Sequence, residues 1–289
     1  MTGTLPSNAK KVAFQGEPGA YANLAAREAL PQAMALPSPT FEDAIAAVRD
    51  RSADLCIIPV ENSLYGRIAD IHHLLPGAGL YIVGEHFHPV RHQLLGIEGA
   101  TLAELKTVFS QGPALGQCRK IIHELNLRAQ VWHDTAGSAR HVAELKDRTA
   151  SAIASSLAAE IYGLEILKPD VEDAPHNMTR FLIMAAEPDD ALPEAGPVIT
   201  SFIFRVRNVP AALYKALGGF ATNSVNMTKL ESYQLGGSFN ATQFYADIEG
   251  HPEERRVRLA LEELKFFCAT MTVLGVYPAH PFRKQMPAI

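Results

Sequence analysis

One pattern recurs along the chain between Lys11 and Ala154: a short apolar strand runs into a polar turn, and a helix-forming stretch follows. Segments 11–14, 54–60 and 107–109 are three such strands. A helix between successive strands favours a parallel sheet with helices on its faces. Repeated this often in a chain of 289 residues, the pattern predicts an α/β fold with two lobes facing a cleft.

Polar side chains follow several of these strands where each strand ends. Glu61, Asn62 and Ser63 come directly after one apolar strand, Ser110 follows another, and Thr135 lies in the turn after a third. Open α/β sheets bind ligands beyond the carboxyl ends of their strands, so we expect these side chains to hydrogen-bond a substrate. Glu61 is the exception, because a carboxylate beside an anion is either protonated or turned away to orient a neighbour. Turn chemistry alone would also select asparagine and serine here.

The first turn, 15–21, carries Gly16 and Gly19 and leads into a helix. Free N–H groups at a helix start favour a bound anion. The turn has neither the G-x-G-x-x-G pattern nor the Gly-Lys-Ser/Thr ending of nucleotide-binding loops, which favours a small carboxylate over a nucleotide.

The segment Asn177-Met178-Thr179-Arg180-Phe181 places a hydroxyl beside a guanidinium at the start of an apolar run. A threonine hydroxyl can share a proton with a leaving oxygen, and an arginine can hold a carboxylate with two hydrogen bonds. The pair therefore suits an anionic substrate that loses a group. The alternative for Arg180 is a solvated residue at the edge of a strand.

The pattern changes after a segment rich in proline and acidic residues at 188–197, which we interpret as a linker. Residues 198–280 then read as strand, helix, two strands, helix and strand. This βαββαβ order predicts an α+β, ferredoxin-like unit. A regulatory or dimerising role is the default for such a unit.

Composition excludes several classes of partner. The net charge of −5 and the absence of a basic stripe argue against nucleic acid, and no apolar stretch approaches the length of a membrane span. Three cysteines without a C-x-x-C pair favour a reducing cytoplasm. His86 and His88 could share one face of a strand, but no acidic or cysteine partner recurs at ligand spacing. We therefore expect no metal.

Several ordered motifs together resemble the monofunctional prephenate dehydratases that carry a C-terminal ACT domain. The matching segments are Phe14-Gln15-Gly16, Pro59 to Ser63 with Gly66, Gln117-Cys118, Thr135-Ala136, Asn177 with Thr179-Arg180-Phe181, and Asn226 with Thr228 to Ser232. The resemblance implies a catalytic domain at 10–187 that is similar to two-lobed periplasmic binding proteins, with its second lobe near 90–170. It also implies an ACT regulatory domain at 198–280.

The resemblance also implies roles for particular residues. The catalytic set is Thr179, Arg180 and Phe181, and the substrate-binding set is Glu61, Asn62, Ser63, Ser110, Gln117 and Thr135. The effector-binding set is Ala211, Ala212, Leu213, Asn223, Asn226, Glu231 and Ser232. The chain departs from the family pattern at Ala22, where serine is common, and at Gln111, where histidine is common. It also departs at Ala211, where the family motif has glycine, and after Ser232, where Tyr233-Gln234 replaces Arg-Pro.

The function implied is conversion of prephenate to phenylpyruvate, water and carbon dioxide, without metal or cofactor, in a cytoplasmic homodimer or homotetramer that phenylalanine inhibits. Aromatisation drives this reaction, so the enzyme must fix a dianion and supply one proton donor. Two alternatives stay open from the sequence. One is an arogenate dehydratase, and the other is a non-catalytic sensor of amino acids.

Overall fold

The computed structural model describes residues 9–207, 209–234 and 241–285. They form two compact units. One contains Ala9–Ile71 and His86–Phe181, and the other contains His72–Glu85 and the chain from Leu182 onward. The predicted domain limits at 10–187 and 198–280 follow sequence pattern instead, and they stay a prediction.

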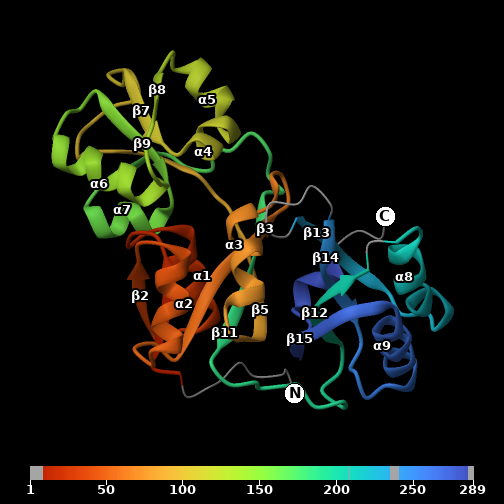
Figure 1. The fold of residues 1–289 in the computed structure, drawn as a ribbon. Coiled ribbons are helices and arrows are strands. Elements are labelled where there is room, and N and C mark those ends of the chain that lie inside the picture. The colour runs from red at the N-terminus through yellow and green to blue at the C-terminus, as the bar shows by residue number, and fades with distance from the viewer. Residues whose placement is uncertain (1–8, 208, 235–240, 286–289) are drawn as a thin grey trace. The chain divides into compact units, whose positions relative to one another are not determined.

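Three sheets organise the chain (Figure 1). The first has the order β2-β1-β3-β11-β5, with β4 beside β3, and the second has the order β10-β6-β9-β7-β8. Strands β1, β2 and β3 pair in parallel, as do β8, β7 and β9, which is the arrangement the repeated strand–turn–helix pattern predicts. The first sheet and its helices comprise β1 (Lys11–Gln15), α1 (Tyr21–Ala29), β2 (Met34–Ser38), α2 (Phe41–Arg49), β3 (Leu55–Asn62), β4 (Gly66–Arg67), α3 (Ala69–Leu74), η1 (Leu75–Gly77), β5 (Tyr81–Pro89) and β11 (Met178–Ala185). The second comprises β6 (Gln93–Gly96), β7 (Thr107–Ser110), α4 (Gly112–Gln117), α5 (Arg119–Glu124), β8 (Arg128–Val131), α6 (Thr135–Leu145), β9 (Ala150–Ala154), α7 (Ser156–Tyr162) and β10 (Glu165–Lys168).

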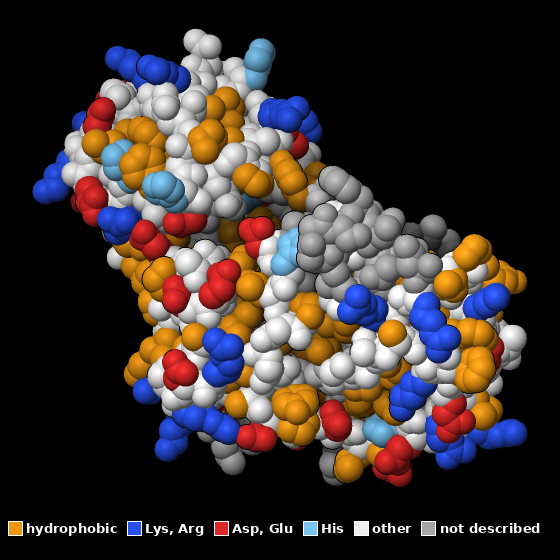
Figure 2. All heavy atoms as spheres, viewed as in Figure 1, with side chains coloured by type: hydrophobic (Ala, Val, Ile, Leu, Met, Phe, Trp, Pro, Cys, Tyr) orange, Lys and Arg blue, Asp and Glu red, His pale blue; other side chains and the backbone are white. Residues whose placement is uncertain are grey.

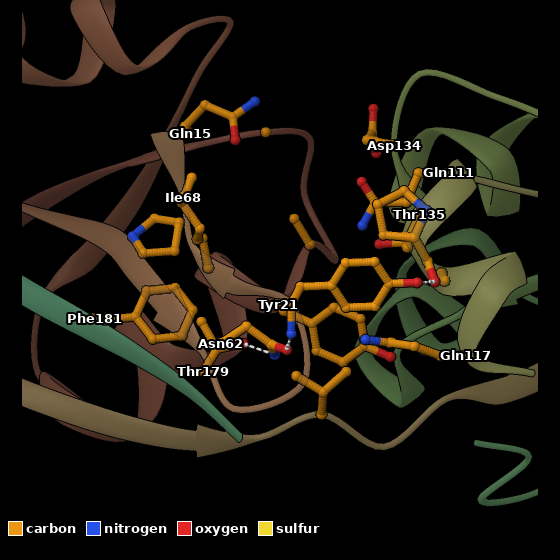
Figure 3. A pocket seen from close by; sticks show the side chains of 18 of the residues that line it. Gln15, Tyr21, Asn62, Ile68, Gln111, Gln117, Asp134, Thr135, Thr179 and Phe181 are labelled. Carbon is orange, nitrogen blue, oxygen red and sulfur yellow. Dashed lines mark hydrogen bonds between the residues drawn. The ribbon is translucent and has the colours of Figure 1, made fainter. Parts of the chain in front are cut away.

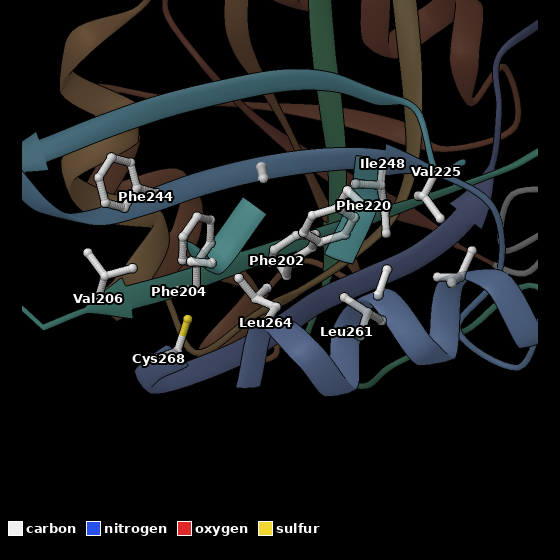
Figure 4. Packing of buried hydrophobic residues seen from close by; sticks show 14 residues of the cluster. Phe202, Phe204, Val206, Phe220, Val225, Phe244, Ile248, Leu261, Leu264 and Cys268 are labelled. Atoms are coloured by element: carbon white, nitrogen blue, oxygen red, sulfur yellow. The ribbon is translucent and has the colours of Figure 1, made fainter. Parts of the chain in front are cut away.

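The third sheet has the order β13-β14-β12-β15, in which the first strand of the unit pairs with its third and its fourth. Its elements are β12 (Val198–Val206), α8 (Ala212–Thr222), β13 (Met227–Gln234), β14 (Ala241–Glu249), α9 (Arg255–Phe267), β15 (Cys268–Pro278) and the short η2 (Pro281–Gln285). The ferredoxin-like order predicted from the sequence is confirmed. Aromatic rings of Phe202, Phe204, Phe220 and Phe244 lie between this sheet and its helices (Figure 4). Each such ring stabilises the fold by about 1.5–3 kcal/mol when fully buried.

The helix-forming stretch that follows the predicted strand at 107–109 is divided in the structure. Helix α4 ends at Gln117 and α5 begins at Arg119, because Cys118 between them is not helical. The N–H of Asp173 donates to the carbonyl of Gln117, and the Asp173 carboxylate accepts from the N–H groups of Arg119 and Lys120. A side chain distant in sequence therefore caps α5 at a new start.

The turn between β1 and α1 is held against the second sheet's helices. Arg140 of α6 donates two hydrogen bonds of 2.8 Å to Glu17, and Ser155 donates to the carbonyl of Gly19. The backbone of Gly19 is left-handed, with φ +92°, and a Cβ built there would lie 2.8 Å from the Cα of Ala158. Glycine at this position is what allows α7 to approach the turn.

We expect Gly19→Ala to lower the free energy of unfolding by about 2–4 kcal/mol, because it adds both backbone strain and a backbone clash. Gly99→Ala is the matched control: φ there is +75°, but the new Cβ meets only the end of Arg148, at 3.7 Å. Denaturant unfolding of both variants measures the steric part as the difference. Equal losses would show that Ala158 yields without cost.

Candidate active site

A cavity of about 460 Å³ opens within the unit formed by Ala9–Ile71 and His86–Phe181. Asn62, Thr179 and Phe181 lie on one side of it, and residues that follow strands of the second sheet lie on the other (Figure 3). The complete lining is Gln15, Gly16, Ala20, Tyr21, Ala22, Phe41, Pro59, Asn62, Tyr65, Ile68, Asp70, Val90, His92, Gln111, Pro113, Ala114, Gln117, Asp134, Thr135, Thr179 and Phe181. Its volume lies in the range of small-molecule sites.

Thr179 lies at the start of β11, where alternation along the strand turns Thr179 and Phe181 toward the pocket. The Thr179 side chain is almost buried, at 8% exposure. Its Oγ1 accepts a hydrogen bond of 3.0 Å from Nδ2 of Asn62. In the described chain no residue accepts the hydroxyl hydrogen of Thr179, so this proton remains available to a ligand.

The orientation of Asn62 is fixed by the backbone. The N–H groups of Leu64 and Tyr65 donate to its Oδ1 at 3.0 and 3.1 Å. Because a backbone N–H can only donate, the oxygen of the amide must face this turn, and Nδ2 must point the other way. The Asn62 Nδ2 group donates to Oδ1 of Asn177 at 2.7 Å as well as to Thr179. Asn62 therefore determines that Thr179 acts as an acceptor in the protein and as a donor to a ligand.

The same reasoning extends the chain of hydrogen bonds to His92. Asn177 Nδ2 donates to Oε1 of Gln117 at 3.0 Å, and His92 Nε2 lies 2.7 Å from the same oxygen. An amide oxygen only accepts, so His92 Nε2 carries a hydrogen. Burial lowers the pKa of His92, which favours the neutral ring and leaves Nδ1 as an acceptor. The Tyr21 hydroxyl lies 2.8 Å from this Nδ1 and 2.9 Å from the carbonyl of Arg91, so the two acceptors share its one hydrogen. Burial also raises the pKa of Tyr21, so this hydroxyl keeps its proton.

Arg180 lies outside the pocket, contrary to its predicted contact with a substrate carboxylate. Its side chain is 3% exposed, and Nη1 donates to Oε1 of Glu61 at 2.9 Å. Neither residue lines the pocket, because each alternates with a neighbour that does, Thr179 in β11 and Asn62 in β3. A buried guanidinium requires a carboxylate partner. Glu61 thus fits the interpretation in which it orients a neighbour rather than a ligand.

Two predicted substrate-binding serines also lie outside the lining. Ser110 is fully buried, and its Oγ donates to the carbonyl of Ile153 in the adjacent strand at 2.6 Å. The Ser63 hydroxyl donates to the carbonyl of His176 at 2.9 Å and accepts from the N–H of Met178. Ser63 thereby fixes the chain just before Thr179. Both hydroxyls serve the fold, so their assignment to substrate binding is not supported by this geometry.

Of the predicted catalytic and substrate-binding residues, the structure brings Thr179, Phe181, Asn62, Gln117 and Thr135 together at the pocket. Sequence reasoning missed Tyr21, His92 and Asp134 as lining residues and Asn177 as the link behind them. Asn177 belonged to a recognised motif, but its sequence context gave no sign that Asn62 and Gln117 would meet it.

The described lining of the pocket contains no lysine or arginine and includes the carboxylates of Asp70 and Asp134, so an anion bound there would depend on backbone N–H groups. Tyr21 and Thr135 are the first residues of α1 and α6, and both line the pocket. The first N–H groups of a helix have no acceptor within the helix and carry the positive end of its dipole. Asp134 accepts from the N–H of Gly137 at 2.7 Å and so caps α6. The two helix starts favour carboxylates.

The residues predicted to bind an effector lie around α8 and β13. Ala211 precedes α8 with a left-handed backbone, φ +60°, which is costly for alanine and free for glycine. Ala212 begins the helix, and Leu213 packs against the core of the third sheet. Glycine would adopt this backbone conformation without strain, which explains why the family motif has glycine where this chain has Ala211.

The remaining predicted effector residues lie at the other end of α8 and along β13. Asn223 ends the helix by donating from Nδ2 to the carbonyl of Gly219 at 2.8 Å. Asn226 donates to Glu249 at 3.1 Å, and Glu231 accepts from Nζ of Lys229 at 3.3 Å. Ser232 follows in the same strand. Gln234 ends the described part of β13.

Comparison with known proteins adds the following. The family model for prephenate dehydratase matches residues 12–189. A bifunctional N-acyl-homoserine lactone acylase/prephenate dehydratase of Komagataeibacter europaeus is 55% identical over 275 residues, covering 95% of this chain and 98% of the relative. Arogenate dehydratase 2 of Petunia hybrida is 38% identical over 284 residues, covering 93% and 72%. The structure of a prephenate dehydratase in complex with L-Phe from Arthrobacter aurescens has a TM-score of 0.85 at 27% identity, covering 96% and 92%.

We expect the stability of the protein to depend on pH through His92. Its pKa is lowered by burial, so the unfolded chain takes up a proton near the ordinary value of about 6.5 while the folded chain resists it. This contribution is complete above that pH and is lost as the pH falls. The wild-type melting temperature should therefore fall more steeply between about pH 7 and pH 5 than that of His92→Gln, which keeps a donor toward Gln117.

The comparison of the two curves also separates His92 from His86, whose pKa is likewise lowered by burial and which is present in both proteins. Parallel curves would contradict the neutral assignment of His92.

Proposed function

Because the chain belongs to the prephenate dehydratase family, we propose that this pocket converts prephenate to phenylpyruvate, carbon dioxide and water. The observation that carries the proposal is the Thr179 hydroxyl, which accepts from Asn62 and keeps its own hydrogen for a ligand. A leaving hydroxyl group needs such a donor.

The reaction consumes one proton in all. As the ring carboxylate leaves as carbon dioxide, the electron pair of its C–C bond enters the ring, and the C–O bond to the opposite hydroxyl breaks. The departing oxygen takes a proton and leaves as water. Thr179 donates its hydrogen bond to that oxygen, and Nδ2 of Asn62 stabilises the negative charge that develops on Oγ1. Solvent supplies the proton that the balance requires.

The two carboxylates of the substrate need partners other than Arg180, which is paired with Glu61. We assign them to the starts of α1 and α6, where Tyr21 and Thr135 lie, with the amide of Gln117 between. Phe181 packs beside the ring. Helix N–H groups are held rigidly by the fold, so they fix the dianion without the entropy cost of ordering a long cationic side chain.

Prephenate and arogenate differ only in the side chain of the substrate, which bears a keto group in prephenate and an amine in arogenate. The residues that contact this side chain therefore determine the substrate preference. Two carboxylates line the pocket: Asp134, which caps Gly137, and Asp70. An ammonium group could therefore meet Asp70, and the lining does not by itself exclude arogenate. We propose prephenate as the preferred substrate because the matching family model is that of prephenate dehydratase, and kcat/KM for the two substrates tests this choice.

A single activity for the pocket, as in a monofunctional enzyme, is also a proposal. The name of the Komagataeibacter relative also includes an acylase activity. Cleavage of an amide by an acylase would need a nucleophilic side chain that contacts a general base. Among the described lining residues there is no serine or cysteine, and His92 reaches Thr179 only through Gln117, Asn177 and Asn62. Thr179 has no base to activate it for attack on an amide.

Thr179→Val keeps the shape of the side chain and removes the hydroxyl, so we expect kcat on prephenate to fall about 10²–10⁴-fold with a much smaller change in KM. Thr179→Ser should keep most of the activity. The measurement is phenylpyruvate formation without added metal, with arogenate and an N-acyl-homoserine lactone as parallel substrates. A Val variant that retains its kcat would remove Thr179 from the mechanism, and cleavage of the lactone amide by wild-type protein would refute the single activity.

We propose further that the unit from Val198 onward is an ACT domain that binds L-phenylalanine. Support comes from its ferredoxin-like strand order and from the similar structure determined with L-Phe. We expect paired units in a homodimer or homotetramer to form the binding site for this effector. The three free, buried cysteines support a cytoplasmic location. Among the described helices, none is long and apolar enough to span a membrane.

L-Phenylalanine should inhibit turnover by favouring a less active state. Asn226→Ala should weaken this inhibition and leave uninhibited activity unchanged, because Asn226 lies in the C-terminal unit and outside the pocket lining. Titration of the activity with phenylalanine measures inhibition, and calorimetry measures binding, in the wild type and the variant. A wild-type protein that neither binds nor responds would refute the proposal, and an equally inhibited variant would exclude Asn226 from the effector site.

A further inference from the structure

A pair of histidines in β5 contacts a carboxylate near the C-terminal end of α1. His86 and His88 lie two residues apart in β5, so their side chains leave the same face of the strand. Glu28 of α1 approaches both: its Oε2 lies 3.0 Å from His86 Nε2 and 2.8 Å from His88 Nδ1. This is the acidic partner that spacing in the sequence could not supply, because it comes from a different element.

The three ligand atoms lie near one another, all within 4.8 Å, so small movements of the side chains would bring them onto one ion. Bonds of about 2.0–2.1 Å in a tetrahedral zinc site place ligand atoms about 3.3 Å apart. A retreat of the Glu28 carboxylate by a few tenths of an ångström from both rings would make room for the ion. The side chain of Glu28 is 46% exposed and can make this movement, whereas His86 and His88 are 14% and 6% exposed and held by the strand.

The ligand types indicate which ion would bind, and the exposure of Glu28 indicates how the ion would arrive and where a water could act as its fourth ligand. Two imidazoles and one carboxylate are nitrogen and oxygen ligands suited to zinc and neighbouring divalent ions rather than to magnesium or calcium. The carboxylate lies at the solvent side, so an ion can arrive past Glu28 and keep a water as its fourth ligand.

We propose that Glu28, His86 and His88 bind one divalent transition-metal ion, with zinc as the reference ion. The site lies outside the pocket lining and does not depend on the proposed reaction. A bound ion would link α1 to β5. This link would lie close to the pocket, because the ring of His88 lies 6.0 Å from that of Tyr21, a lining residue.

The test uses untagged, metal-stripped, full-length protein and zinc chloride in calorimetry, with cobalt(II) as a spectroscopic probe. We expect one tight zinc per chain, a higher melting temperature with zinc, and a visible cobalt spectrum of tetrahedral intensity. Glu28→Gln should weaken zinc binding at least about tenfold, since even groups behind a ligand cost 10–100-fold when changed. Glu42→Gln, an exposed glutamate at the start of α2, is the matched control and should bind like wild type.

Zinc binding of equal strength in wild type and Glu28→Gln would overturn the proposal, as would no binding to wild type at all; the cluster would then be only a hydrogen-bonded joint. If Glu28→Gln does not fold, the wild-type cobalt spectrum decides the question. An octahedral spectrum of low intensity would refute the two-histidine site, and His86→Gln should abolish a tetrahedral one.

Discussion

The pair of hydrogen bonds from the backbone N–H groups of Leu64 and Tyr65 to Asn62 determines the direction of every polar contact behind the pocket. Backbone N–H groups cannot reverse their role, whereas amides and imidazoles can be turned at little cost in shape. Once Asn62 is fixed, Thr179 has to accept from it, and each later amide follows in turn. A tight turn after β3 thus sets the protonation pattern of a residue in β11.

The proposed binding of a dianion at the pocket does not use a mobile cation. A guanidinium at the position of Arg180 would be a strong carboxylate ligand in principle, but strand alternation gives that position to the interior, where Glu61 neutralises it. Removing Glu61 alone would take away a carboxylate that neutralises this buried charge. The pair is best understood as a fixed support under Thr179, with the helix starts providing the positive potential.

The distribution of charged side chains on the surface agrees with recognition by backbone N–H groups inside the pocket. On the face seen in Figure 2, basic and acidic side chains are intermixed and do not gather into a surface of one sign. Long-range attraction of a dianion by that face is therefore weak, and recognition has to take place at short range, where desolvated N–H groups act strongly.

Sequence patterns predicted the strand–turn–helix units and the ferredoxin-like order, because these depend on periodicity. The family resemblance placed Thr179 and Asn62 in one site but did not indicate that they would be hydrogen-bonded to each other. The sequence motifs failed for Arg180 and Ser110, since a motif names residues but does not reveal which face of a strand each one takes. Glu28 was missed for a related reason: it meets His86 and His88 only through the packing of α1. That helix is nine residues long, about 13 Å, and carries Tyr21 at one end and Glu28 at the other. A short helix moves as one rigid element, so whatever fixes Glu28 against β5 also restrains Tyr21, whose hydroxyl lies 2.8 Å from His92.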